Sequence, residues 1–321
     1  MTTSNILILS AGRRVELVNA FLNEVKYRNL ASKVLTADAK PHLSAACKKA
    51  DASFELPRVS DPSYIDSLLK TCLKNSIDLV IPTIDTELQI LTNNKQMFLD
   101  QGINIVISDS PLIQACRDKR LTSLLFESLS IDTPKIYSLS NMQFPCFAKP
   151  YDGSCSIGAL KINGPEDLTP AMRQDSKLMF MAFVDECHTE FTVDAYFDKT
   201  GSLSCLVPRE RIEVRGGEVS KGITRQHAVY DYLLPKLKNL KGAQGCITLQ
   251  LFANIAENSY AAIEINPRFG GGFPLTYEAG ANYPRWLIDE YLLNKQISFF
   301  DDWENNLLML RYDAHILVHQ A

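Results

Sequence analysis

The distribution of apolar and polar positions divides the chain into two parts with different secondary structure. Up to about residue 112, short apolar runs alternate with segments that carry apolar residues at helical spacing. The runs are NILILS, KVLTAD, DASFELP, IDLVIPT and INIVISD, and the helix-like VELVNAFLNEVKY follows the first of them. Strands alternating with helices indicate a parallel sheet with helices on its faces, so we predict an α/β domain over residues 1–112.

The pattern changes from about residue 142, where strand-like segments follow one another directly. They are CFAKP, ALKIN, KLMFMAF, EFTVDAYFD, GSLSCLVP, CITLQLFAN and YAAIEIN, and short turns with glycine or asparagine separate several of them. Helical patterns return at DYLLPKLKNL and YPRWLIDEYLL. This part predicts an antiparallel-rich α+β region.

The composition narrows the class of protein. The chain has 321 residues with 46% hydrophobic and 22% charged residues, and its net charge of −4 argues against a nucleic-acid-binding protein. No apolar run is long enough to span a membrane or to serve as a signal sequence, so we expect a cytoplasmic protein. The eight cysteines form no CxxC pair and are expected to be reduced thiols, and the scattered histidines indicate no zinc site.

The segment AAIEINPRFGGGF, residues 261–273, places polar side chains at alternating positions. On a strand, Glu264 and Asn266 share one face, and Arg268 could extend the row beyond a proline. A hairpin with the preceding CITLQLFAN, centred near Glu257, puts Gln250 opposite Glu264. Carboxylate and amide oxygens in this arrangement suit Mg²⁺, with phosphate completing its shell. The alternative is an ordinary half-solvated strand.

A second candidate is the loop in FAKPYDGSCSIGALKI, residues 147–162. Lys149 ends a strand, and Gly153, Ser154, Ser156 and Gly158 follow in a loop that leads to the next strand. Free backbone N–H groups and hydroxyls suit phosphate oxygens, and the lysine supplies a point charge. The alternative is a glycine-rich hairpin with a surface lysine.

The stretch PRERIEVRGGEVSKGITRQ, residues 208–226, is rich in arginine. Arg209, Arg211 and Arg215 have the same parity, so an extended chain places them on one face, where they suit a polyphosphate or a carboxylate. The alternative is a solvated strand whose arginines pair with the neighbouring acids Glu210, Glu213 and Glu218.

The first domain also has features of a dinucleotide-binding fold, but they are incomplete. SAGRRVE carries a single glycine after the first strand, where GxGxxG is expected, and Asp38 ends the second strand. The hypothesis of an NAD-dependent oxidoreductase therefore rests on this domain alone, and this function is the least favoured.

Taken together, these segments resemble the ATP-grasp superfamily, and most closely its compact carbamoyl-phosphate-synthase-like ligases. The resemblance covers nearly the whole chain and includes ILILSAGRRVELVNAF, DLVIPTIDTELQIL, CRDKRLT, FAKPYDGSCSIG, MFMAFVDECHTEFTVDAYF and IEINPRFGGG. It implies a parallel-sheet pre-ATP-grasp domain over residues 1–112, followed by a two-lobed ATP-grasp domain. The small lobe with its glycine-rich loop would span residues 113–185 and the C-terminal lobe residues 186–321.

The resemblance also implies a role for each candidate residue. ATP phosphates would be bound by Lys119, Lys149, Gly153, Ser154 and Ser156. Adenine would lie against the hinge Met181, Ala182, Phe183 and Val184, where the family often has Glu or Gln first, and the ribose would bind Glu190. Magnesium would be held by Gln250, Glu264 and Asn266. Phosphoryl and acyl-phosphate transfer would be assisted by Arg268, with Arg211 and Arg215 serving phosphate or a substrate carboxylate.

The function implied by the resemblance is an ATP-dependent carboxylate–amine ligase, with a thiol as an alternative acceptor. It would act through an acyl phosphate, with ATP and Mg²⁺ or alternatively Mn²⁺ as cofactors. Its partners would be small-molecule carboxylates and amines, with no nucleic acid or membrane, and a homodimer is compatible with this interpretation. The alternative from another class is a non-catalytic ATP-binding regulatory protein with the same fold.

Overall fold

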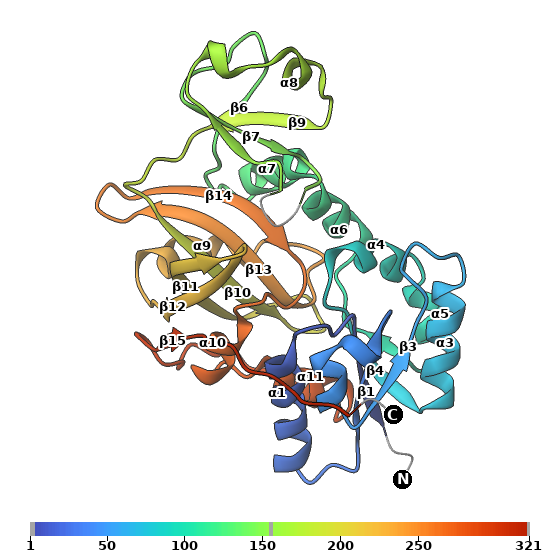
Figure 1. The fold of residues 1–321 in the computed structure, drawn as a ribbon. Helices are drawn as coiled ribbons and strands as arrows, with labels where there is room; N and C mark the ends of the chain where they lie inside the picture. The colour runs from blue at the N-terminus through green and yellow to red at the C-terminus, as the bar shows by residue number, and fades with distance from the viewer. Residues whose placement is uncertain (1–3, 154–156, 320–321) are drawn as a thin grey trace.

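The computed structural model describes residues 4–153 and 157–319, which form three sheets arranged along the chain. In Figure 1 the N-terminal sheet lies at one end, the four-stranded sheet at the other, and the six-stranded sheet between and beside them. Both parts predicted from the sequence pattern are confirmed: a parallel α/β unit comes first and antiparallel sheets follow. No helix among the described residues is long and apolar enough to cross a membrane.

The N-terminal sheet is parallel and has the strand order β3-β2-β1-β4-β5. Its strands are β1 (Asn5–Leu9), β2 (Val34–Asp38), β3 (Ala52–Glu55), β4 (Ile77–Ile81) and β5 (Asn104–Ile105). The helices are α1 (Val15–Tyr27), α2 (Ala45–Lys49), α3 (Tyr64–Lys74), α4 (Asp85–Asn93), α5 (Lys95–Leu99) and α6 (Ser110–Arg117), with a 3-10 turn at Pro41–Leu43. Strand β1 is buried at all five positions, as expected for the centre of a sheet covered on both faces.

The order of this sheet reverses between β1 and β4, because the chain moves outward to β2 and β3 and then returns to the other side of β1. The loops that follow these two strands therefore leave a crevice between them at the carboxyl edge of the sheet. Crevices at such switch points are where open α/β sheets bind ligands.

The four-stranded sheet has the order β6-β9-β7-β8 and is antiparallel at each pairing. Its strands are β6 (Ile136–Tyr137), β7 (Cys146–Pro150), β8 (Leu160–Ile162) and β9 (Leu178–Ala182). Helix α7 (Lys119–Ser128) precedes it, and α8 (Pro170–Gln174) lies between β8 and β9 after a 3-10 turn at Pro165–Asp167. The sheet has a small hydrophobic core of its own, which includes Tyr137, Cys146 and Phe180.

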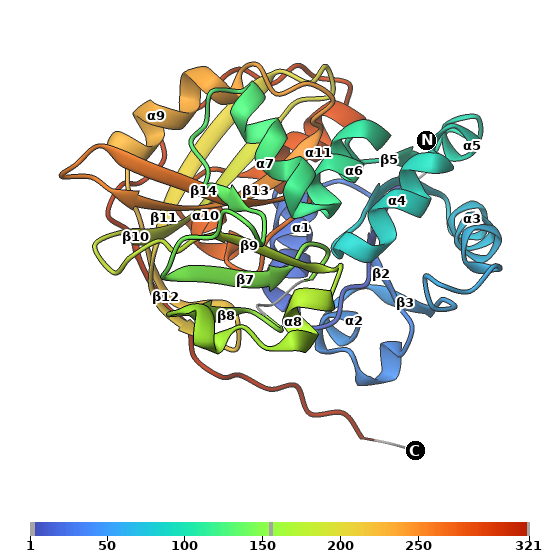
Figure 2. The ribbon, with the colours of Figure 1, turned by 90° about the horizontal axis from the view of Figure 1, so that it is seen from above.

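The six-stranded sheet has the order β14-β13-β10-β11-β12-β15. Its strands are β10 (Thr189–Phe197), β11 (Leu203–Arg215), β12 (Glu218–Thr224), β13 (Gly245–Asn254), β14 (Ser259–Asn266) and β15 (Leu308–Leu310). Helices α9 (Ala228–Leu237), α10 (Phe273–Glu278) and α11 (Tyr283–Tyr291) pack with it. Beyond β15 the last part of the described chain extends away from the body of the fold (Figure 2).

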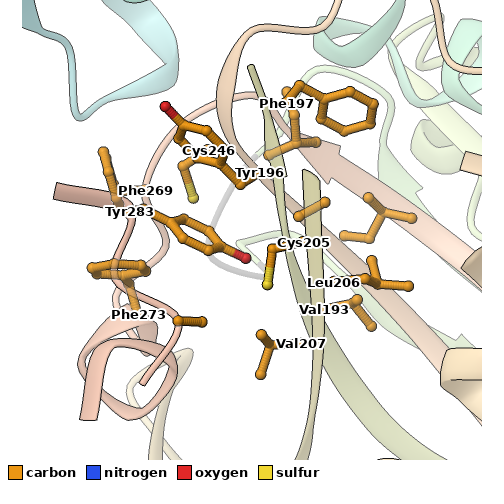
Figure 3. Packing of buried hydrophobic residues seen from close by; sticks show 14 of the residues in the cluster. Val193, Tyr196, Phe197, Cys205, Leu206, Val207, Cys246, Phe269, Phe273 and Tyr283 are labelled. Atoms are coloured by element: carbon orange, nitrogen blue, oxygen red, sulfur yellow. The ribbon is translucent and has the colours of Figure 1, made fainter. Parts of the chain in front are cut away.

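An aromatic cluster fixes the segment that follows β14. Phe269 and Phe273 contact each other edge to face with ring centroids 4.7 Å apart, and Phe273 packs on Tyr283 at 5.3 Å. The Tyr283 hydroxyl donates to the Asp194 carbonyl oxygen on β10 at 3.0 Å. Figure 3 shows these rings beside the buried residues of β10 and β11. The glycines between the two phenylalanines are therefore anchored to the core at both ends.

Candidate functional site

A single cavity of about 720 Å³ contains most of the predicted site residues. Its walls come from β7 and β9 of the four-stranded sheet, from one face of the six-stranded sheet, and from the loops after β1 and β4. The predicted residues that line it are Lys119, Lys149, Gly153, Met181, Ala182, Phe183, Val184, Glu190, Arg211, Gln250, Glu264, Asn266 and Arg268. Ser154 and Ser156 lie outside the described residues.

The hairpin of β13 and β14 brings the predicted oxygen donors together. Gln250 is directly opposite Glu264, as predicted, and Thr248 is opposite Asn266. The register shifts by one residue between Gln250 and Leu251, so β14 carries an additional residue, Ile263. Such a bulge turns neighbouring side chains toward the same side, and both Ile263 and Glu264 line the cavity.

Polar contacts link the end of β14 into one network. Asn266 Nδ2 donates to Glu264 Oε1 at 2.7 Å, and Arg268 Nη2 donates to Asn266 Oδ1 at 3.1 Å. Lys119 Nζ lies 3.9 Å from Glu264 Oε2. Carboxylate and amide oxygens therefore share a small region with two cations, which is an arrangement suited to bound phosphate.

The residues on this network fit magnesium that arrives together with a phosphate ligand. Gln250, Glu264 and Asn266 supply hard oxygen donors from facing positions of one hairpin. Among residues 4–153 and 157–319, no group of three or more His, Cys, Asp or Glu side chains is placed to hold a metal ion by itself. Magnesium commonly binds through one or two carboxylates with substrate phosphates and water, so one carboxylate with two amides is sufficient.

Two lysines meet beside the glycine-rich loop. Lys149, at the end of β7, is 9% exposed, and Lys119 Nζ donates to the Gly153 carbonyl oxygen. Burial, followed by the charge of Lys119, lowers the pKa of Lys149 to about 8, while Glu264 opposes the shift. A buried ammonium beside a second cation favours a bound polyanion, because the anion offsets both the repulsion and the lost hydration.

This lowered pKa predicts that Mg-ATP binding depends on pH. In the free protein the Lys149 ammonium loses its proton above about pH 8, whereas bound phosphate favours the protonated form. We expect the dissociation constant for Mg-ATP to increase about tenfold between about pH 7 and about pH 9, with proton uptake on binding. Calorimetry in two buffers with different ionisation enthalpies measures both quantities.

Lys149→Arg provides the control for this titration. Arginine keeps its charge over the whole interval, so the variant should bind Mg-ATP with an affinity that changes little with pH. A wild-type affinity that stays constant from about pH 7 to about pH 9 would show that Lys149 does not contact the nucleotide phosphates.

The predicted adenine hinge lies where β9 leaves its sheet. Met181 and Ala182 still pair with neighbouring strands, whereas Phe183 and Val184 follow the end of β9. Main-chain groups beyond a strand are available for a ligand, as adenine recognition requires. Phe147 also lines this part of the cavity.

Glu190 and Arg211 face each other across neighbouring strands. Arg211 Nε lies 3.3 Å from Glu190 Oε2, and Arg211 Nη1 donates to Thr192 Oγ1 at 3.3 Å. Burial raises the pKa of Glu190, and the charge of Arg211 opposes this shift. The contact of the buried Arg211 Nε with Glu190 is an ion pair without hydrogen-bond geometry, so among the described residues this donor has capacity left for a ligand.

Arg215 lies apart from the other predicted residues. Register shifts on either side of Glu213 change which face the following residues occupy, so Val214 lines the cavity and Arg215 does not. The Arg215 side chain is 76% exposed and its Nη1 lies 3.2 Å from Asp313 Oδ2. Arg209 forms a buried ion pair with Asp194 at 2.9 Å. Arg209 also lines the cavity, so the shared face predicted from parity holds for Arg209 and Arg211 and fails for Arg215.

The glycines at 270–272 allow the chain to approach the sheet closely. A Cβ on Gly272 would lie 2.2 Å from Arg209 Nη1, and one on Gly271 would lie 3.1 Å from the Glu218 carboxyl carbon. None of the three glycines adopts a positive φ, so close approach and not a left-handed turn explains why glycine occupies these positions.

The cavity also contains residues of the N-terminal domain that the sequence did not single out. Arg14 follows β1, and Thr83 and Asp85 follow β4. Arg268 Nη2 donates to Asp85 Oδ2 at 2.7 Å, so an ion pair joins the N-terminal domain to the end of β14. In the sequence, these residues were indicated by their position alone. Charged residues directly after parallel strands lie at the same edge of the sheet.

Comparisons with known proteins agree with this architecture. Residues 6–106 match the family described as "PylC-like, N-terminal domain", and residues 174–307 match "ATP-grasp in the biosynthetic pathway with Ter operon". The carbamoyl phosphate synthase large chain of Methanobrevibacter smithii is 22% identical over 250 residues, which cover 70% of this chain. The matched region covers 23% of that relative's length.

Solved structures of similar fold include three named enzymes. The biotin carboxylase domain of the Hydrogenobacter thermophilus 2-oxoglutarate carboxylase, solved with MgADP, ADP and bicarbonate, has a TM-score of 0.74 at 15% identity and covers 95% of this chain and 73% of its own. The Staphylococcus aureus N5-carboxyaminoimidazole synthetase with ADP has a TM-score of 0.69 at 16% identity, covering 96% and 80%. The L-amino acid ligase of Bacillus licheniformis has a TM-score of 0.66 at 15% identity, covering 90% and 74%.

The chain has the ATP-grasp fold. Residues 174–307 match an ATP-grasp family model, residues 6–106 match the PylC-like N-terminal model, and the similar solved structures cover most of the chain, which agrees with the resemblance seen in the sequence.

Proposed function

We propose that this protein is an ATP-dependent carboxylate–amine ligase. The observation that carries the proposal is the convergence of Lys149, Glu264, Asn266 and Arg268 on one cavity. Two cations beside a pair of oxygen donors suit a triphosphate and its metal. An ordinary half-solvated strand would not need this combination of side chains. Relatives of the same fold include enzymes solved with ADP, which supports ATP and Mg²⁺ as cofactors.

In the proposed reaction, a substrate carboxylate oxygen attacks the γ-phosphorus of ATP, and ADP leaves. The resulting acyl phosphate is attacked at its carbonyl carbon by an amine, which loses a proton, and inorganic phosphate leaves. Lys119 and Lys149 would bind the phosphates, and Gln250, Glu264 and Asn266 would hold the metal, which supplies charge neutralisation during transfer. Arg268 would orient and stabilise the transferring group with its planar guanidinium.

The remaining assignments belong to the same proposal. The nucleotide base would contact Phe183 and Val184, and the ribose would bind Glu190. Arg211 would serve phosphate or a carboxylate, and Arg215 would do so only if its strand end moves toward the cavity. We place the domain boundaries at residues 112 and 185, and we propose a reducing compartment, the cytoplasm, because the cysteines of the described chain are free thiols.

The test is a screen of carboxylates with amines, scored by ADP release and by mass detection of the product. A ligase releases ADP only when a suitable pair is present. Mg-ATP binding without turnover against a broad panel would favour the alternative of a non-catalytic regulatory protein. A new amide of the expected mass, formed together with ADP, identifies both substrates.

Nucleotide preference provides an independent prediction. The loops after β1 and β2 use Asp38 structurally, because its oxygens accept from the backbone nitrogens of Gly12 at 3.0 Å and Lys40 at 3.1 Å. This structural role and the missing GxGxxG in the loop after β1 both favour Mg-ATP over NADH, so we expect Mg-ATP and not NADH to stabilise the protein. Saturating Mg-ATP should raise the unfolding temperature by about 5 °C. Stabilisation by NADH alone would contradict the proposal.

A further inference from the structure

Arg14 occupies the switch point of the N-terminal sheet. It directly precedes α1, in the loop after β1, and its Nη2 donates to the carbonyl oxygen of Thr83 in the loop after β4 at 2.8 Å. Both residues line the cavity, and so does Asp85, which pairs with Arg268. Arg14 therefore faces the ATP-grasp lobes from the carboxyl edge of the parallel sheet, where such sheets bind ligands.

The charge of Arg14 has no carboxylate partner within the described part of the chain. None of the ion pairs there includes Arg14, although Arg13, Arg28, Arg268 and others have acidic partners. Burial, followed by the charge of Arg268, lowers the pKa of Arg14 to about 10, so the group remains charged at neutral pH. A partly buried and unpaired guanidinium is costly unless an anion binds to it.

A buried carboxylate holds the two loops that present Arg14. Glu87 is fully buried and accepts from the backbone nitrogens of Thr83 at 2.7 Å and Ile84 at 3.2 Å, and from Ser10 Oγ at 2.7 Å. Ser10 adopts a positive φ of 49°, a conformation uncommon outside glycine and asparagine. Three hydrogen bonds to one buried group fix the loops before a ligand binds, which lowers the cost of ordering on binding.

The groups around Arg14 differ from those around the proposed phosphate site. The charges that act on Lys149 are those of Lys119 and Glu264, whereas the charges that act on Arg14 are those of Arg268, Glu218, Asp85 and Glu87. Glu218 is shared with Arg311, whose Nη1 lies 3.1 Å from its Oε2, and Asp85 is engaged by Arg268. Glu87 accepts from the backbone nitrogens of Thr83 and Ile84, so each acid near Arg14 already has another partner.

We infer that Arg14 binds the carboxylate of a small substrate, at a subsite formed by the loops after β1 and β4 and the end of β14. The inference rests on the proposed function, because it assigns the part of the cavity that ATP would leave free. Arg14 acts there as a specificity residue, and the guanidinium, held at Thr83, offers its other N–H donors to two carboxylate oxygens.

A binding experiment tests the subsite without requiring turnover. Unfolding temperatures are measured with acetate or succinate, against sodium chloride at equal ionic strength, for wild type, Arg14→Gln and Arg13→Gln. Arg13 is the matched control, because it is the adjacent residue and its side chain is 88% exposed. Wild type and Arg13→Gln should gain about 2 °C with a carboxylate, and Arg14→Gln should gain nothing. Equal responses of the two variants, or no response of wild type, would overturn the inference.

Mg-ATP is included in the same experiment to separate the two claims. If Arg14→Gln retains the Mg-ATP response, the variant is folded and its nucleotide site is intact. If Mg-ATP did not change the unfolding temperature of wild type, the proposed ligase function would be refuted. The effect of the carboxylates would still decide whether Arg14 binds a carboxylate. Loss of the Mg-ATP response in Arg14→Gln alone would assign Arg14 to the nucleotide and overturn the inference.

Kinetics identify which substrate carries the carboxylate. With a substrate pair found by ADP release, Arg14→Gln should increase the KM of one substrate about 10- to 100-fold and leave the KM of ATP unchanged. Arg14→Lys should recover part of this loss, because it restores the charge without the planar pair of donors. Unchanged KM values for both substrates would refute the assignment.

Discussion

Replacing Glu264 by alanine is expected to reduce ADP release by about 10³-fold or more while leaving the protein folded. Glu264 is the one carboxylate among the proposed metal ligands, so its loss removes the charge that holds the metal. Its structural contacts are few: its side chain is 23% exposed, it accepts from Asn266 at 2.7 Å, and Lys119 lies 3.9 Å away. The unfolding temperature should therefore fall by about 2–4 °C or less.

Two further variants complete the test of Glu264. Glu264→Gln keeps the size and one acceptor oxygen but removes the charge, so it should lose turnover nearly as completely as the alanine variant. Glu257→Ala changes an exposed glutamate at the turn of the same hairpin and should behave as wild type. Near-normal ADP release by Glu264→Ala would show that the metal assignment is wrong.

Arg268→Lys is expected to lower kcat about 10²-fold and to change the affinity for ATP by less than about threefold. Lysine keeps the positive charge but cannot reproduce the planar arrangement in which Arg268 Nη2 donates to both Asp85 at 2.7 Å and Asn266 at 3.1 Å. In the proposed mechanism, the lysine ammonium would not present two donors aligned with the transferring phosphoryl group. Steady-state kinetics and calorimetry with Mg-ATP on one preparation measure both quantities.

The matched control is Arg225→Lys, the same exchange in an ion pair on the same sheet that does not line the cavity. Arg225 Nε donates to Glu210 Oε2 at 2.8 Å. This variant should keep the kcat of wild type. If Arg268→Lys lost only affinity for ATP, or kept full turnover, Arg268 would have no role in the transition state.

Local sequence determined the strands and most of the candidate site. Period-two alternation in YAAIEIN gave Glu264 and Asn266 a common face, which depends on geometry within one strand. A hairpin centred near Glu257 predicted Gln250 opposite Glu264. The structure has this pair, but it reaches it through a turn closed by Asn254 and Ser259 together with the additional residue Ile263. The parallel N-terminal sheet was predicted from apolar runs that alternate with amphipathic segments.

Parity alone failed where the strands are irregular. The shared parity of Arg209, Arg211 and Arg215 predicted one face. Arg209 and Arg211 both line the cavity, but register shifts beside Glu213 direct Arg215 to the surface. The bulge at Ile263 has the same origin and works in the opposite direction, because it places Ile263 and Glu264 side by side on the cavity wall. A bulge depends on pairing with a neighbouring strand, so alternation within one strand does not reveal it.

Contacts between distant parts of the chain were decided only by the tertiary structure. Asp85 pairs with Arg268 across 183 positions of sequence, and Arg14 reaches Thr83 across 69. Neither pair leaves a periodic signal, because each joins loops whose approach depends on how the sheets pack. The sequence thus determined which residues could bind a nucleotide and a metal, and the packing of the N-terminal domain against the ATP-grasp lobes decided which further charges complete the cavity.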